Sequence, residues 1–204
     1  MVKVKVCGIT NVEDALVAYE SGADALGLIF AEIPRRVGVE QAADISSVLP
    51  DDILKVGVFV NAEPEEVLRI AEKAGLDYAQ LHGDEGSEAV SAIRDHGLAV
   101  MKALRVRDAR SLERLEDYGA DLYLLDAYSG RERGGTGKTF DWGLAKALEG
   151  YGNIVVSGGL TPENVREAVE FLNPYGVDAS SSLEESPGRK NSERVRRFVS
   201  AAKG

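Results

Sequence analysis

The chain has 204 residues, and its 24 Lys and Arg residues against 34 Asp and Glu residues give a formal net charge of −10. A single cysteine, Cys7, excludes an internal disulfide and a cysteine-rich zinc module, and favours a reducing compartment, the cytoplasm. The acidic balance would repel a nucleic-acid backbone, and no apolar run approaches the roughly 20 residues needed to cross a bilayer. We therefore expect no nucleic-acid partner and no membrane partner.

Short apolar runs of strand length recur along the chain, and most are followed by a segment with helical apolar spacing. The predicted strands are Val2–Val6, Ala25–Phe30, Leu54–Val60, Tyr78–Leu81, Ala99–Leu104, Leu122–Leu125, Ile154–Val156 and Gly176–Asp178. The predicted helices include Val12–Glu20, Gln41–Val48, Pro64–Lys73, Ala109–Asp117, Pro162–Phe171 and Ser192–Ala202. Asn11 precedes the first of these helices, and Thr161 precedes Pro162 as a predicted N-cap.

Alternating strands and helices predict a parallel sheet with right-handed crossovers, and strands that are apolar throughout are covered on both faces. The simplest closure of eight such units is a TIM (β/α)8 barrel, with residues 1–204 as one small domain. The alternative is an open doubly wound sheet, which usually carries a G-x-G-x-x-G turn after its first strand. The first turn here reads Cys7-Gly8-Ile9-Thr10, so the sequence favours the barrel.

Polar side chains gather directly after the predicted strands. In chain order they are Cys7, Arg35, Arg36, His82, Asp84, Asp126, Ser157, Gly158, Gly159, Asp178 and Ser180–Ser182. Because the active sites of barrel enzymes lie at the carboxyl ends of the strands, we expect these residues to share one pocket.

The loops after the last two strands predict a phosphate site. Gly158 and Gly159 lead into a predicted helix start, and Ser180 and Ser181 follow the eighth strand. Barrels often bind phosphate in these two loops through backbone N–H groups. The alternative for Gly158 and Gly159 is a tight turn without a ligand.

Cys7 and Asp126 are the candidate catalytic groups. A thiol at the end of a strand can act as a base or nucleophile, and a carboxyl directly after a buried run is a candidate general acid. The alternatives are a buried packing role for Cys7 and a structural role for Asp126 in the following loop. His82 is expected to line the pocket and His96 to face solvent, and no spacing of ligands predicts a metal site.

The segment Gly134–Thr139 only partly resembles a nucleotide-binding P-loop. The motif requires a glycine where this chain has Glu132, so the sequence does not predict ATP or GTP binding. The length and glycine content of this segment instead predict a flexible lid over the pocket.

Five blocks of sequence resemble the phosphoribosylanthranilate isomerase family of tryptophan biosynthesis over essentially the whole chain. They are K-V-C-G-I-T-N from Lys5, Q-L-H-G from Gln80, L-L-D-A from Leu124 with G-G-T-G-K-T-F-D-W from Gly134, S-G-G-L-T-P-E-N-V from Ser157 and G-V-D-A-S-S from Gly176. The resemblance implies a TIM barrel that performs an Amadori rearrangement, in which an N-glycosidic aminoaldose phosphate becomes an aminoketose phosphate.

The same resemblance implies roles for particular residues. Asp126 matches the family's general acid, Cys7 its general base and Arg36 the arginine that holds the anthranilate carboxylate. Asp178 matches an aspartate near the substrate. The implied ligand is a phosphorylated anthranilate-ribose, with no metal and no organic cofactor, because the nitrogen of the substrate serves as the electron sink.

Two positions depart from the family pattern. The residues before Arg36 read Ile33-Pro34-Arg35, so Arg35 could share or replace the role of Arg36. Ser182 stands where the family usually has glycine, and it would be strained if that position has a positive φ.

Two other functions stay open at this point. One is an aminoimidazole-carboxamide ribotide isomerase, which is expected to carry Asp in place of Cys7; the other is a phospholigand-binding protein that has lost catalysis. The protein is expected to be a monomer or a homodimer.

Overall fold

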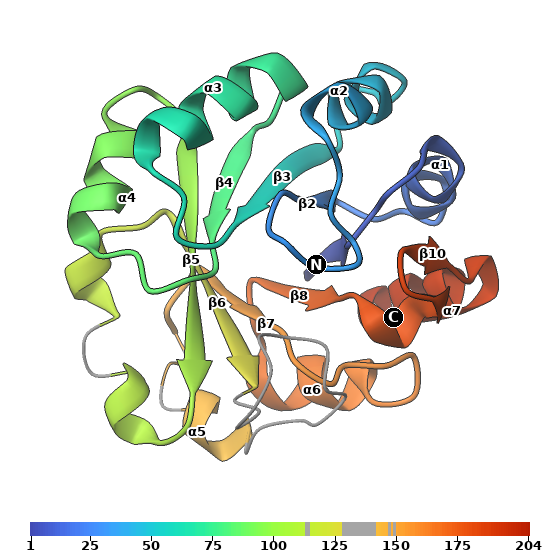
Figure 1. The fold of residues 1–204 in the computed structure, drawn as a ribbon. Helices are drawn as coiled ribbons and strands as arrows, with labels where there is room; N and C mark the ends of the chain where they lie inside the picture. Colours follow the sequence, from blue (N-terminus) through green and yellow to red (C-terminus); the bar gives the residue numbers. More distant parts are fainter. Residues whose placement is uncertain (113–114, 128–141, 147, 149) are drawn as a thin grey trace.

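A computed structural model describes the whole chain except residues 113–114, 128–141, 147 and 149. Strands β1 to β8 form a closed barrel in which every neighbouring pair is parallel, and β1 pairs with β8 to complete the ring (Figure 1). The fold is a single-domain TIM barrel, as the sequence predicts.

The strands of the barrel agree closely with the predicted ones. They are β1 (Lys3–Cys7), β2 (Ala25–Ile29), β3 (Leu54–Phe59), β4 (Tyr78–Leu81), β5 (Ala99–Val106), β6 (Leu122–Ala127), β7 (Ile154–Val156) and β8 (Gly176–Ala179). Cys7 is the last residue of β1 and Asp126 is the last but one of β6, so both belong to the strands rather than to the loops that follow. Strand positions are held more firmly than loop positions, which suits a group that must meet a substrate precisely.

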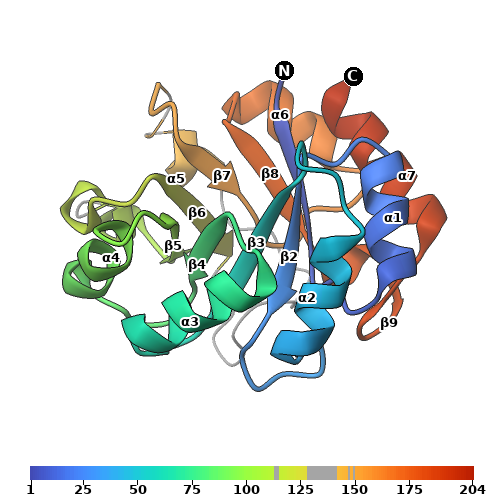
Figure 2. The same ribbon diagram turned by 90° about the horizontal axis from the view of Figure 1, so that it is seen from above.

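Helices surround the barrel, as Figure 2 shows from above. They are α1 (Val12–Glu20), α2 (Val39–Ser47), α3 (Pro64–Ala74), α4 (Ser87–Arg94), α5 (Trp142–Lys146), α6 (Val165–Leu172) and α7 (Ser192–Lys203). The hairpin of β9 (Glu184–Ser186) and β10 (Arg189–Lys190) precedes α7, which packs against both α1 and α6. No described helix has the length and apolar character needed to cross a membrane.

Between β5 and β6 the predicted helix is wrong. Residues 109–117 instead contain the 3-10 turns η1 (Ala109–Leu112) and η2 (Glu116–Tyr118). Ser111 Oγ accepts hydrogen bonds from the N–H groups of Arg107 and Asp108, and such local side-chain bonds compete with α-helical pairing. Conversely, α4 and α5 are helices for which the sequence predicted no range.

The two predicted helix starts have different outcomes. The Oδ1 atom of Asn11 accepts from the Asp14 N–H at 2.8 Å, so Asn11 is an N-cap as predicted. Thr161 is not one, because α6 begins at Val165 after Asn164. The carbonyl of Thr161 accepts from the N–H groups of Asn164 and Val165, which leaves residues 161–164 as a separate turn.

The interior of the barrel changes character along its axis. Its amino-terminal half is filled by an apolar cluster of Met101, Ala103, Leu122, Leu124 and Val155. Nearer the carboxyl ends, buried polar side chains take over, namely Lys5, Gln80, Asp126, Ser157 and Asp178. Buried polar groups are costly unless they are paired, so this concentration marks the functional end of the barrel.

Candidate active site

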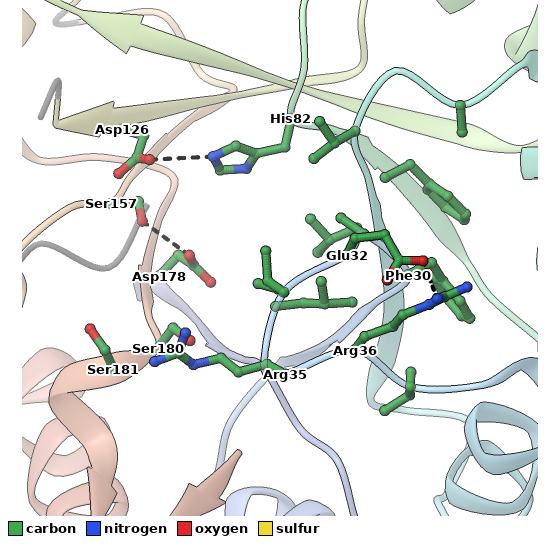
Figure 3. Close-up of a pocket in the computed structure, with 18 of the residues that line it drawn as sticks. Phe30, Glu32, Arg35, Arg36, His82, Asp126, Ser157, Asp178, Ser180 and Ser181 are labelled. Atoms are coloured by element: carbon green, nitrogen blue, oxygen red, sulfur yellow. Dashed lines mark hydrogen bonds and ion pairs between the residues drawn. The ribbon is translucent and has the colours of Figure 1, made fainter. Parts of the chain in front are cut away.

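A cavity of about 790 Å³ opens at the carboxyl ends of the strands. Figure 3 shows three groups of side chains around it: His82 with Asp126, Ser157 and Asp178 with Ser180 and Ser181, and Phe30 with Glu32 and Arg36. Gly158 and Gly159 also line it. Of the residues that the sequence predicts for the site, all line this cavity except Asp84 and Cys7, and Cys7 is discussed below.

Asp126 and His82 face one another across the cavity wall, with His82 Nε2 3.3 Å from Asp126 Oδ2 (Figure 3). On the other side of the ring, Gln80 Nε2 donates to His82 Nδ1 at 2.8 Å. With Gln80 Nε2 as the donor to Nδ1, the imidazole is able to donate from Nε2 to the carboxyl of Asp126. His82 therefore lines the pocket, as predicted, and also orients Asp126.

The loop that carries His82 is anchored by a buried ion pair that the sequence analysis did not identify. Lys102 Nζ donates to Glu85 Oε2 at 2.7 Å, and also to the carbonyls of Leu81 and Gly83. Glu85 in turn accepts from the N–H groups of Asn61 and Gly83. Burial raises the pKa of Glu85, but Lys102 and these backbone donors outweigh it and hold the pKa below its usual range.

The loop after β7 presents two consecutive left-handed glycines. Gly158 has φ 83° and Gly159 has φ 71°, a conformation that side-chain-bearing residues seldom adopt. Asn164 holds the loop, since its Nδ2 donates to the Gly159 carbonyl at 3.0 Å and its Oδ1 accepts from the Thr161 N–H. Successive N–H groups in such a turn form a concave site for an anion, so this geometry supports the predicted phosphate loop.

Ser182 does not have a positive φ, so the condition under which it would be strained is not met. Among the described non-glycine residues only Asn61 and Asn173 have a positive φ. Ser182 instead lies in the 3-10 turn η3 (Ser181–Leu183), and its Oγ donates to the Leu160 carbonyl at 2.5 Å. The serine thereby ties the loop after β8 to the loop after β7.

Arg35 and Arg36 have different surroundings. The Nε and Nη2 atoms of Arg35 both bind the carboxylate of Glu184 at 2.8 Å, and Glu184 is buried. Arg36 is exposed and pairs with Glu32, which is itself almost wholly exposed (Figure 3). A guanidinium with two nitrogens already bound to a buried carboxylate is less available to a ligand than one held by a solvated carboxylate.

Cys7 lies beneath the cavity rather than on its wall. It packs with Ile29 and Val58, both of which do line the cavity. Gly27 is its register partner on β2, and a Cβ at Gly27 would lie 2.6 Å from Cys7 Sγ, so only glycine leaves room for the thiol. Burial raises the pKa of the Cys7 thiol above its ordinary value, while Lys5 and Lys190 act in the opposite direction.

Asp178 is engaged on both carboxylate oxygens. Its Oδ1 accepts from Lys5 Nζ at 2.8 Å, and its Oδ2 accepts from Ser157 Oγ at 3.0 Å. Lys5 and Lys190 are buried cations that could not be predicted from the sequence, because no local pattern shows which carboxylate a lysine will meet. Glu184, the partner of Lys190 at 3.0 Å, was missed for the same reason.

Three further predictions concern metals, histidine and the lid. Within the described residues no group of three His, Cys, Asp or Glu side chains could hold a metal ion. His96 is exposed, as predicted, and its Nδ1 donates to the Ala92 carbonyl. The predicted lid, Gly134–Thr139, lies outside the described residues.

Comparison with known proteins agrees with the family resemblance. The sequence profile of the N-(5'-phosphoribosyl)anthranilate (PRA) isomerase family matches residues 4–201. The chain is 68% identical to N-(5'-phosphoribosyl)anthranilate isomerase from Rubrobacter xylanophilus over the full length of both chains. It is also similar to phosphoribosyl anthranilate isomerase from Thermotoga maritima, with a TM-score of 0.93 and 43% identity over both full chains.

A second structure of such an enzyme contains a ligand, reduced 1-(o-carboxyphenylamino)-1-deoxyribulose 5-phosphate. The chain matches it over the full length of both chains, with a TM-score of 0.90 and 41% identity. Profile, full-length identity and fold all agree. The chain therefore belongs to the N-(5'-phosphoribosyl)anthranilate isomerase family.

Proposed function

We propose that this protein isomerises N-(5-phosphoribosyl)anthranilate to 1-(2-carboxyphenylamino)-1-deoxyribulose 5-phosphate in tryptophan biosynthesis, in the cytoplasm. The observation that carries the proposal is one cavity whose wall holds the Asp126 carboxyl, the left-handed Gly158–Gly159 turn and the exposed guanidinium of Arg36. An acid, an anion cradle and a second cation suit a substrate that carries a sugar, a phosphate and a carboxylate.

Asp126 is the general acid of the proposed reaction. It donates its proton to the ring oxygen of the ribose, the bond from that oxygen to carbon 1 breaks, and the nitrogen lone pair forms the Schiff base. The carboxylate that remains on Asp126 accepts the hydrogen bond from His82 Nε2, 3.3 Å away. A positioned acid of this kind typically accelerates a step by about 10²- to 10⁴-fold.

Cys7 is the general base. Its thiolate removes the proton from carbon 2 of the open-chain sugar, and the electrons of that C–H bond move toward the iminium nitrogen to give an enolamine. The enolamine then tautomerises to the ketone. Cys7 lies below the cavity, so the reacting carbon has to enter deeply, between Ile29 and Val58.

The phosphate of the substrate occupies the loops after β7 and β8. Gly158 and Gly159 supply backbone N–H groups in the left-handed turn, and Ser180 and Ser181 line the same side of the cavity (Figure 3). Anchoring the phosphate there fixes the position of the sugar carbons relative to the acid and base. Asp178 supports this side of the site through Ser157.

Arg36 rather than Arg35 holds the anthranilate carboxylate. Replacing Arg36 by Met is expected to raise KM by about 10- to 100-fold, because a hydrogen bond to a charged group contributes about 1.5–3 kcal/mol. The matched variant Arg35→Met is expected to change KM less, since Arg35 is bound to Glu184. Steady-state kinetics on both variants measure this, and a larger KM effect in Arg35→Met would reverse the assignment.

The direct test of the proposed function is turnover. Phosphoribosylanthranilate generated enzymatically is expected to be consumed by the purified protein without added metal, seen as decay of anthranilate-type fluorescence. Inorganic phosphate is expected to inhibit competitively by occupying the glycine turn. Decay no faster than the spontaneous breakdown of the substrate would refute the proposal and favour a binding protein without catalysis.

A further inference from the structure

A buried ion pair lies beneath the active-site cavity, where β1 and β8 close the barrel. Lys5 and Asp178 are register partners on these strands, and Lys5 Nζ lies 2.8 Å from Asp178 Oδ1. The two side chains are only 4% and 7% exposed. Transferring two charges out of water costs several kcal/mol for each ion, so a pair at this depth is weak evidence for stability.

Lys5 is placed to act on Cys7. Successive side chains of a strand alternate between its faces, so Lys5 and Cys7, two residues apart on β1, point into the barrel together. Both side chains are buried on this face of β1, so the Lys5 ammonium acts on the sulfur through little water and favours the thiolate by charge attraction. Asp178 holds the ammonium in this position, and Ser157 holds Asp178.

The charges around Cys7 favour an anion there. Four charged side chains interact electrostatically with the sulfur, namely Lys5, Lys190, Arg35 and Asp178. A second carboxylate, Glu184, pairs with Arg35 and Lys190. Each carboxylate is already paired with at least one of the cations. One positive charge is therefore in excess, and a thiolate at Cys7 balances it.

We propose that Lys5, fixed by Asp178, is a positioning residue that stabilises the thiolate of Cys7 against the cost of its burial. The action of Lys5 on the thiol does not depend on the proposed function. The inference rests on that function only where it takes the thiolate as the base of the isomerisation. It also gives Asp178 a role, since both oxygens of its carboxylate serve to hold Lys5 and Ser157.

The two influences on Cys7 oppose one another. Burial raises the pKa of the Cys7 thiol, and Lys5 lowers it. Burial also lowers the pKa of Lys5, but Asp178 and Cys7 outweigh that effect and leave it above its ordinary value, so Lys5 stays charged. Burial and Asp178 both raise the pKa of the thiol. Without the Lys5 ammonium to oppose them, the thiolate is expected to form only at higher pH.

The test uses the fact that the chain has one cysteine. Isotope-labelled cysteine gives a single Cβ signal in NMR spectra, and the pH dependence of that signal reports the ionisation of Cys7 alone. In Lys5→Met the titration midpoint is expected to rise by about 1–3 pH units, the usual effect of removing a neighbouring opposite charge. In the pH profile of kcat, the acidic limb is expected to move to higher pH by the same amount.

Matched variants separate this effect from general damage. Lys3→Met removes another lysine of the same strand, paired with Asp24 at the surface, and is expected to leave the midpoint unchanged. Lys5→Arg keeps the charge and is expected to keep the midpoint near that of the unaltered protein. If Lys5→Met does not fold, the double variant Lys5→Met/Asp178→Asn, compared with Asp178→Asn, measures the same effect without an unpaired buried carboxylate.

The outcomes distinguish the inference from the proposed function. An unchanged midpoint in folded Lys5→Met, or in the double variant relative to Asp178→Asn, would overturn the inference. A raised midpoint with an unmoved kcat profile would uphold the action of Lys5 on the thiol and overturn the role of Cys7 as the base.

Discussion

Asp126→Asn is expected to lower kcat by about 10²- to 10⁴-fold, with a much smaller change in KM. The amide has nearly the shape of the carboxyl, and it can still accept the hydrogen bond from His82 Nε2. It cannot supply the proton that ring opening requires. The loss therefore falls on the chemical step, which steady-state kinetics with phosphoribosylanthranilate separates from binding.

Two comparisons make this result specific. Asp95→Asn alters an exposed carboxyl at the end of α4 that does not line the cavity, and it is expected to leave kcat unchanged. Thermal unfolding of Asp126→Asn checks that the barrel is intact. A folded Asp126→Asn protein with a kcat near that of the unaltered enzyme would show that another group protonates the ring oxygen.

Cys7→Ala is expected to lower kcat by a similar factor, because the methyl group cannot take the proton from carbon 2. Cys7→Ser fits the same space beside Gly27 but carries a hydroxyl that ionises far less readily than a thiol, so it is expected to be nearly as slow. Cys7→Asp restores a basic group next to Lys5 and is expected to recover part of the rate. The order of kcat among the three variants thus reports the basicity of the side chain at position 7 rather than its volume.

The pH dependence adds a second readout for Cys7. The base acts when deprotonated, and burial raises the pKa of the thiol, so kcat is expected to increase as the pH rises through the Cys7 titration. In Cys7→Asp this acidic limb is expected to lie at lower pH, since carboxylates ionise at lower pH than thiols. A limb at the same pH in both enzymes would mean that a different group supplies the base.

Much of the fold could be predicted because its signals are local. A buried parallel strand is a short apolar run, and a crossover helix repeats its apolar residues every three or four positions, so the barrel strands appear in the sequence nearly at their observed bounds. The failure at residues 109–117 is also local, since Ser111 binds the backbone of Arg107 and Asp108 and favours a 3-10 turn. The prediction of Thr161 as an N-cap is wrong because α6 begins three residues later than predicted, with Asn164 at its N-cap position.

The candidate site was only partly predictable. Strand ends in a barrel meet at one rim, so a list of polar residues after the strands already named Asp126, His82 and the glycine turn. The pairing of Arg35 with Glu184 joins residues 149 positions apart, and that of Lys5 with Asp178 joins residues 173 positions apart. No local pattern reveals which distant carboxylate a lysine or arginine will meet.

The sequence by itself therefore determined the barrel, its family and the types of residue at its rim, because each of these follows from patterns among residues that are close together in the chain. Only the tertiary structure decided that Arg36 is exposed while Arg35 is held by Glu184, that Ser182 bridges two loops without strain, and that Cys7 lies under the cavity beside Lys5. The Lys5–Asp178 pair forms when β1 closes on β8, and Ser182 reaches the loop after β7 because β7 and β8 are neighbours, so closure of the barrel fixes partners that are far apart in the chain.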